Sequence, residues 1–167
     1  VLFAAAHQRR RHVFTYVGGG PSSTIYKSTD GGKTWAKSAS GLPGGDNGRI
    51  GLCYSADPEI IYAMVEAQEG KGGFFRSTDR GASWEKQGGH VTSGNYYVEI
   101  FAHPTEPNTV ISMDVFNQIT RDGGKSWSRL GEEYKHVDNH VIWMDPTDPN
   151  YMLSGCDGGI YETFDGA

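Results

Sequence analysis

Two histidines and an aspartate alternate with other residues near the end of the sequence, as His136, Asp138 and His140. If this stretch is extended, its period of two puts all three side chains on one face. Two imidazoles and a carboxylate suit Zn²⁺ or another first-row metal, and they suit equally a base with its orienting carboxylate in contact with a substrate. A hydrogen-bonded polar network is the third interpretation and the one we expect, so no metal or other cofactor is predicted.

A basic run from Arg9 to His12 could hold a carboxylate or a phosphate through paired hydrogen bonds. Consecutive side chains of an extended segment point in alternate directions. Only Arg9 with Arg11, or Arg10 with His12, could therefore act together. Salt bridges to acidic residues of a neighbouring loop are the alternative.

Several carboxylates could serve a glycoside hydrolase, which requires a pair about 5–5.5 Å apart for retention or about 6.5–9.5 Å apart for inversion. The candidate catalytic residues are Glu99, Asp114, Asp138 and Asp157, and Glu66 is a further carboxylate. The candidate ligand-binding residues are Arg9, Arg11, His12, Arg49, Glu66, His136, Asn139 and His140.

An internal repeat must position these side chains. The segment from Ser28 to Trp35 returns from Ser77 to Trp84 and again from Thr120 to Trp127, and a fourth copy begins at Thr163. The motif recurs at intervals of 43 to 49 residues. A period of this length matches four short strands per unit, which is the size of a propeller blade.

The repeated motif has a structural role in this interpretation. Its Asp-Gly-Gly or Asp-Arg-Gly turn supplies the positive φ angles of a tight hairpin, and the carboxylate accepts hydrogen bonds from nearby backbone N–H and hydroxyl groups. The tryptophan is expected to fold under the hairpin and become buried. The residues assigned to this role are Asp30, Trp35, Asp79, Trp84, Asp122, Trp127 and Asp165.

The strand pattern predicts an all-β chain of antiparallel four-stranded propeller blades. The order of β-rich runs and turns gives three strands of one blade, two complete blades and three strands of a fourth. We expect one propeller fragment with blades at about residues 1–40, 41–89, 90–131 and 132–167. Because propellers close with typically 4–8 blades, the remaining blades would come from a longer chain or from a homodimer that closes the ring.

The predicted topology indicates at which end of the sheets the candidate residues lie. Hairpin loops of a meander alternate between its two ends, so all the repeated motifs lie at one end and the candidate site residues at the other. Polar residues would converge there around a central channel, a place that ligand sites favour. The aromatic residues expected to be exposed near this end, where they could contact a ligand, are Tyr96, Tyr97, Phe116 and Tyr134.

The pattern S/T-x-D-x-G-x-S/T-W resembles the Asp-box, or BNR, repeat of sialidases, xyloglucan-cleaving glucanases, sortilin ectodomains and a photosystem assembly factor. Residues 8–12, 25–35, 48–51 and 136–140 further resemble large secreted bacterial proteins with sortilin-like propellers, often labelled glycosyl hydrolases. This resemblance, which covers essentially the whole chain, implies a secreted, periplasmic or cell-surface location. It also implies a module that recognises a glycan or an extended peptide, with a hydrolase of β-linked glycans and purely architectural blades as alternatives.

Composition supports many short strands and excludes several classes of partner. The 167 residues include 24 glycines and carry a formal net charge of −5. An acidic chain is unsuited to nucleic acid or to an anionic membrane as its main partner, and no apolar run is long enough for a membrane span. Cys53 and Cys156 are expected to be free thiols.

Overall fold

The computed structural model describes residues 1–166, which form sixteen β-strands, one short 3₁₀ turn (η1, Gln68–Gly70) and no α-helix. The first sheet contains β1 (Leu2–Ala6), β4 (Thr24–Ser28) and β5 (Ala36–Lys37). The second contains β6 (Asn47–Tyr54), β7 (Ile61–Ala67), β8 (Gly73–Ser77) and β9 (Glu85–Gly88). The third contains β10 (Ile100–Ala102), β11 (Val110–Ser112), β12 (Gln118–Thr120) and β13 (Ser128–Arg129). The fourth contains β14 (Asn139–Met144), β15 (Met152–Cys156) and β16 (Gly159–Thr163), and a small hairpin pairs β2 (Arg10–Arg11) with β3 (Tyr16–Val17).

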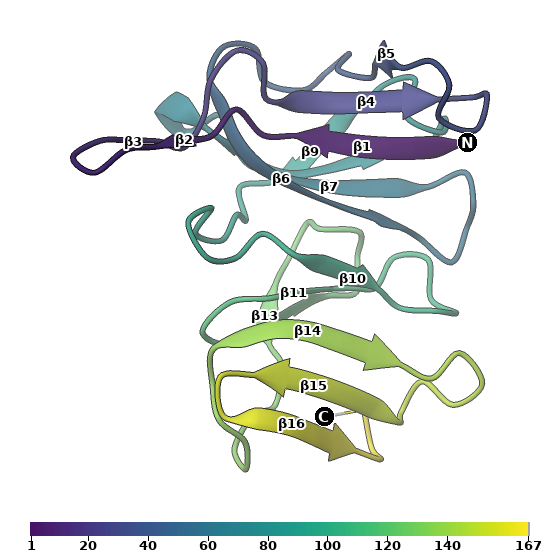
Figure 1. The fold of residues 1–167 in the computed structure, drawn as a ribbon. Helices are drawn as coiled ribbons and strands as arrows, with labels where there is room; N and C mark the ends of the chain where they lie inside the picture. Colours follow the sequence, from purple (N-terminus) through teal and green to yellow (C-terminus); the bar gives the residue numbers. More distant parts are fainter. Residues whose placement is uncertain (167) are drawn as a thin grey trace.

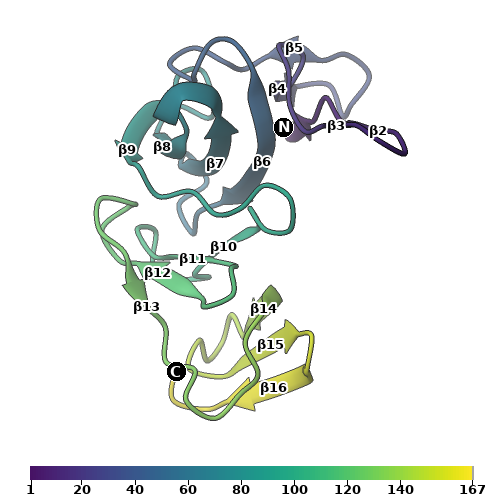
Figure 2. The same ribbon diagram turned by 90° about the vertical axis from the view of Figure 1, so that its left-hand side faces the viewer.

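All strand pairs are antiparallel, and each of the four sheets follows the order of the chain. The sheets lie face to face in sequence order (Figure 1) and fan out when the molecule is turned by 90° (Figure 2). This is the arrangement of propeller blades, and the predicted all-β fold class is confirmed. The strands per sheet, three, four, four and three, agree with the order deduced from the repeat.

The core consists of three apolar clusters, one between each pair of neighbouring sheets. Strand β7 contributes to two of them, because its side chains alternate between faces. Ile61, Ala63 and Val65 pack toward the first sheet, while Tyr62 and Met64 pack toward the third. A strand buried on both faces reads as a continuous apolar run, and the first five residues of β7 are all apolar and buried.

The repeated turns are held by one recurring set of hydrogen bonds. At Asp79, the Ser83 hydroxyl donates to Oδ2 over 2.6 Å, the Ser83 backbone N–H donates to Oδ1 over 2.9 Å, and the Ser77 hydroxyl donates to Oδ1 over 2.7 Å. Asp30 and Asp122 have equivalent partners. These bonds, that of the Ser83 hydroxyl above all, hold the pKa of Asp79 well below its ordinary value. The motif aspartates thus organise the turns, as their role in the sequence predicts.

The expected burial of the motif tryptophans holds for Trp84, holds in part for Trp127, which is half-buried, and is wrong for Trp35. Trp84 is 4% exposed and donates its indole N–H to the Ser38 backbone oxygen of the first sheet. Trp127 stacks on His90, which belongs to the connection after the second sheet. Each of these side chains packs against the preceding sheet, and Trp35, in the first sheet, has no preceding sheet in the described chain and is 42% exposed.

No helix among residues 1–166 is long and apolar enough to cross a lipid bilayer.

Candidate functional site

The Asp-boxes and the candidate site residues lie at opposite ends of the sheets. Strands β4 and β16 both point to the right in Figure 1, toward their Asp-boxes, while the β2–β3 hairpin and the β15–β16 turn lie at the left. We call this left end the loop face. Its candidate residues include Arg49, Glu66, Glu99, Asp138, His140 and Asp157.

Arg49 connects the second and third sheets at the loop face. Its guanidinium forms an ion pair with Glu99 and contacts the Tyr96 carbonyl oxygen over 3.4 Å, and its backbone N–H donates to Glu66 Oε2 over 3.2 Å. A Cβ at Gly94 would lie 1.9 Å from Glu66 Oε2, so this glycine leaves room for the carboxylate. The second oxygen of Glu99, Oε2, is buried without a hydrogen-bond partner among the described residues.

His140 connects the third and fourth sheets at the same face. Its Nε2 atom lies 3.2 Å from Asp157 Oδ1, and its ring stacks on Tyr97 with centroids 5.5 Å apart and planes 24° apart. Tyr97 is buried, whereas Tyr96 is 69% exposed, so the expectation that both would be accessible is wrong for Tyr97. In the structure Arg49, Glu99, His140 and Asp157 thus lie at one end of the sheets.

The stretch from His136 to His140 does not have the alternation on which its metal interpretation depended. Asp138 adopts φ = 72°, in the left-handed region, and β14 begins only at Asn139. The Nδ1 atom of His136 lies 2.6 Å from the Val137 carbonyl oxygen, while His140 contacts Asp157 instead. Among residues 1–166 no group of three or more His, Cys, Asp or Glu side chains could hold a metal ion.

Asn139 is fully buried and has no surface for a ligand. Its amide donates to Glu132 Oε1 over 2.8 Å and to the Val115 carbonyl oxygen over 3.2 Å, and its own oxygen accepts from the Lys135 ammonium. Lys135 in turn forms a 2.7 Å ion pair with Glu132, with side chains only 14% and 4% exposed. A buried ion pair is costly to break once formed, so this network fixes the connection between the third and fourth sheets.

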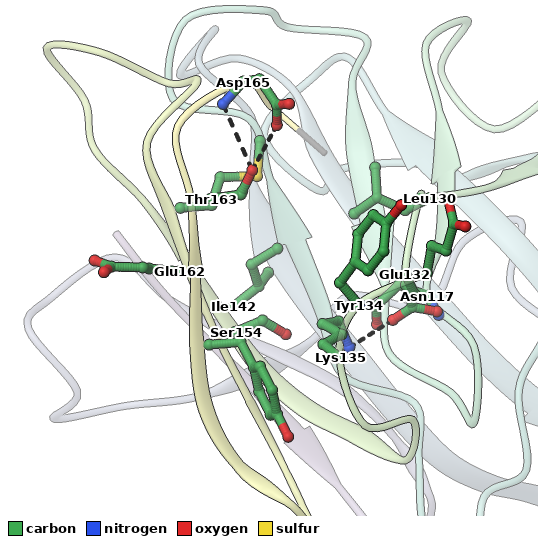
Figure 3. A pocket seen from close by; sticks show the side chains of 14 residues that line it. Asn117, Leu130, Glu132, Tyr134, Lys135, Ile142, Ser154, Glu162, Thr163 and Asp165 are labelled. Carbon is green, nitrogen blue, oxygen red and sulfur yellow. Dashed lines mark hydrogen bonds and ion pairs between the residues drawn. The ribbon is translucent and has the colours of Figure 1, made fainter.

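A cavity of about 350 Å³ opens between the third and fourth sheets above this network (Figure 3). Leu130, Ile142 and Met152 are among the apolar residues of its wall. The side chains labelled in Figure 3 include Asn117, Leu130, Glu132, Lys135, Ile142 and Ser154. Sequence reasoning missed this cavity, because it is built by residues far apart in the chain and carries no motif of its own.

The basic run lies on the projecting hairpin, away from Arg49 and His140. The β2–β3 hairpin extends outward from the first sheet in both views (Figures 1 and 2), and Tyr16 and Val17 at its base line a pocket together with Glu66 of the second sheet. Arg9 lies over the Tyr16 ring, 5.7 Å from its centroid, and the His12 backbone N–H donates to the Thr15 carbonyl oxygen over 2.8 Å. Arg9, Arg11 and His12 are exposed on this hairpin.

Asp114 has a local role in the structure. Its Oδ1 atom accepts the Val115 backbone N–H over 2.8 Å, and its backbone carbonyl accepts the Asn139 N–H over 3.0 Å. Nearby His90 has its pKa lowered, chiefly because burial disfavours the charged imidazolium, while the Asp114 charge acts in the opposite direction.

Antiparallel sheets stacked as blades and joined by Asp-box turns define a β-propeller of the Asp-box type. The BNR/Asp-box repeat model matches residues 26–37 and 118–129. No curated protein matches the sequence.

Three solved structures share the fold. An ancestral GH74 enzyme superimposes with a TM-score of 0.62 at 17% identity, over 86% of this chain and 20% of that chain. The GH74 xyloglucanase from Xanthomonas campestris gives 0.58 at 15% identity, over 89% and 27%. YCF48 bound to a D1 peptide gives 0.55 at 18% identity, over 85% and 42%. The chain thus carries BNR/Asp-box repeats and the propeller fold of GH74 xyloglucanases and YCF48, and it spans 20% to 42% of the length of these structures.

Proposed function

We propose that the loop face is a recognition surface for an extended peptide. The observation that carries this proposal is the row of paired charges across three neighbouring sheets, Arg49 with Glu99 and His140 with Asp157, with the Tyr97 ring against His140. An extended peptide presents backbone donors and acceptors together with alternating side chains, and a row of mixed charges and aromatic rings matches that pattern.

Two further features support a peptide ligand. The buried Oε2 atom of Glu99 lacks a hydrogen-bond partner among the described residues, and a ligand N–H group would supply one. The exposed Tyr96 ring, directly beside Arg49, offers an apolar face for a ligand side chain. YCF48, which has the same fold, has been solved with a bound peptide.

Hydrolysis of a β-linked glycan is the second candidate. The shared fold with GH74 enzymes and the carboxylates of Glu66, Glu99 and Asp157 at one face favour it. Glu99 and Asp157, however, are each engaged by a basic side chain, whereas a hydrolase needs one carboxyl free to donate a proton and another free to attack or activate water. This engagement favours binding over catalysis.

The test uses peptide arrays and xyloglucan oligosaccharides, with fluorescence polarisation to measure the peptides that bind. Arg49→Met and His140→Ala are each expected to weaken binding about tenfold or more, because they remove the central charged contacts. Arg121→Met changes an exposed arginine in an Asp-box turn and is the matched control. Absence of peptide binding, or equal losses for Arg49→Met and Arg121→Met, would contradict the proposal, and release of reducing ends from the oligosaccharides would favour the hydrolase.

A further inference from the structure

A second cavity, of about 470 Å³, opens at the loop face between the first and second sheets. The residues from Tyr16 to Gly19, at the base of the β2–β3 hairpin, form one of its walls. The residues from Glu66 to Gln68, at the end of β7 and the start of η1, form another, and Asp46 and Asn95 complete the lining. The cavity therefore lies between two neighbouring sheets, at the end of the molecule that carries Arg49.

The cavity is lined by two carboxylates and by no basic side chain. The carboxylates are those of Asp46 and Glu66, and none of the nine lining residues is Lys, Arg or His. Among residues 1–166, neither carboxylate forms an ion pair, whereas Glu99 is paired with Arg49 at the same face. The negative charge of the cavity is therefore available to a cationic group of a ligand.

The backbone around Glu66 makes room for its carboxylate and holds it in place. The Arg49 backbone N–H donates to Oε2 over 3.2 Å. A Cβ would lie 2.1 Å from this oxygen at Gly48 and 1.9 Å from it at Gly94, so both positions require glycine while Glu66 lies here. The other oxygen, Oε1, accepts no hydrogen bond within residues 1–166 and can accept one from a ligand.

The rest of the lining suits the hydrocarbon stem of a basic side chain. Tyr16 and Val17 are each 45% exposed, and with Ala67 they give the cavity an apolar side. Lysine and arginine bury their methylene stems along apolar surface while their charged ends meet polar groups. A bare metal ion would leave most of the volume unfilled, and no group of three metal-binding side chains lies within residues 1–166. The lining therefore favours an organic cation.

The cavity adjoins the residues proposed above to bind a peptide. Glu66 accepts the backbone N–H of Arg49, and Asn95 precedes Tyr96, whose carbonyl oxygen contacts the Arg49 guanidinium. A peptide that lies over Arg49 can therefore place one of its side chains in the cavity. Arg9, from the basic run of the hairpin, lines a separate hollow instead.

We propose that this cavity is a subsite for a lysine or arginine side chain of the extended peptide that the loop face binds. The cationic group lies against Glu66 Oε1 and the Asp46 carboxylate, and the stem packs along Tyr16 and Val17. This inference rests on the proposed function and adds to it the class of ligand, which is a basic extended peptide. The formal net charge of −5 agrees with a cationic partner.

The test uses peptides that bind in the arrays and replaces their basic residues one at a time by norleucine, which keeps the stem and lacks the charge. Fluorescence polarisation measures each affinity. We expect the binding peptides to contain lysine or arginine, and one replacement to weaken binding about tenfold or more. Binding peptides without a basic residue, or equal affinities of the lysine and norleucine forms, would overturn this inference alone. No binding by any peptide would contradict the proposed function as well.

Protein variants show where the basic residue lies. Glu66→Gln keeps an oxygen for the Arg49 N–H but removes the charge, and Asp46→Asn removes the second charge. Glu69→Gln is the matched control, because Glu69 is a nearby exposed carboxylate that is paired with Lys71 and does not line the cavity. We expect the first two variants to narrow the difference between lysine and norleucine peptides about threefold or more, and the control to leave it unchanged. An unchanged difference in Glu66→Gln would overturn the inference.

A small ligand and the unaltered protein keep the test decisive if a variant does not fold. Nα-acetyl-lysine methylamide is titrated at millimolar concentration into isotope-labelled protein, and its norleucine analogue is the control. The lysine compound should shift the backbone signals of Gly18, Glu66 and Asn95, which line the cavity, more than the norleucine compound does. Equal shifts from the two compounds, or shifts confined to other residues, would overturn the inference.

Discussion

The motif aspartates show how single residues stabilise this fold. The carboxylates of Asp30, Asp79 and Asp122 each accept hydrogen bonds from a hydroxyl and a backbone N–H four residues later and from a hydroxyl two residues earlier. The ionised form makes these bonds best, so the pKa of Asp79 lies below its unfolded value of about 3.9. Between these two pKa values the unfolded chain therefore binds more protons than the folded one. The contribution of Asp79 to the free energy of unfolding is complete above pH of about 4 and is lost as the pH falls further.

Asp79→Asn is therefore expected to make the free energy of unfolding depend less on pH below about pH 4. The amide oxygen keeps part of the hydrogen bonding but does not titrate. Urea unfolding is measured between about pH 6 and pH 2. Over this range the unfolding free energy of the variant should fall less than that of the unaltered protein. Glu85→Gln, an exposed carboxylate of the next strand, is the control, and the same slope for Asp79→Asn and the unaltered protein would contradict this explanation.

The motif tryptophans differ because of their neighbours. Trp84 lies between two sheets, so Trp84→Ala should lower the free energy of unfolding by about 3–5 kcal/mol, as usual for a large buried aromatic residue. Trp35 occupies the same motif position but is exposed, and Trp35→Ala should cost about 1 kcal/mol or less. Chemical denaturation of both variants measures the difference. Similar losses would show that the turn, rather than packing between sheets, determines the role of the tryptophan.

At the scale of elements, the junction between the first and second sheets depends on a close backbone approach. Gly41 has φ = +86°, and a Cβ there would lie 1.9 Å from the Trp84 carbonyl oxygen. Gly41→Ala should therefore destabilise the protein by about 1–3 kcal/mol. Gly44→Ala, in the same loop, meets no atom within 4 Å and should be nearly neutral. Urea midpoints compare the two variants, and equal effects would contradict the steric explanation.

The repeat allowed the elements to be predicted well, and the site only in part. Strand order follows from local signals, namely apolar alternation and the turn residues of the Asp-box. The conformation of His136 to His140 could not be predicted from alternation, because Asp138 adopts a left-handed conformation set by its tertiary contacts. Lys135 was missed for a similar reason, because its buried position depends on how the third and fourth sheets pack.

At the scale of the whole molecule, the two outer faces of the stack expose apolar side chains. Leu2 and Trp35 lie on the outer face of the first sheet, and Trp143 and Ile160 on that of the fourth. Exposed patches of this kind mark association surfaces. The chain spans only 20% to 42% of the propeller chains that it matches, in which further blades extend the same architecture.

We therefore expect this chain, studied by itself, to associate through its outer faces. Light scattering at increasing concentration should show a mass rising from 18.2 kDa toward that of two chains. Trp143→Lys should suppress the increase, because it places a charge in the apolar face. Phe14→Lys changes an exposed aromatic residue on the projecting β2–β3 connection and should have no effect. A constant single-chain mass at all concentrations would contradict ring closure by a homodimer.

NMR mapping shows where on this protein an extended peptide binds. An isotope-labelled sample is titrated with a peptide selected from the arrays, and backbone chemical shifts are followed. If the peptide binds the loop face, the largest changes fall at Tyr97, Glu99 and His140, which lie together there. Changes confined to β16 and the neighbouring cavity, or to the Asp-box turns, would contradict it.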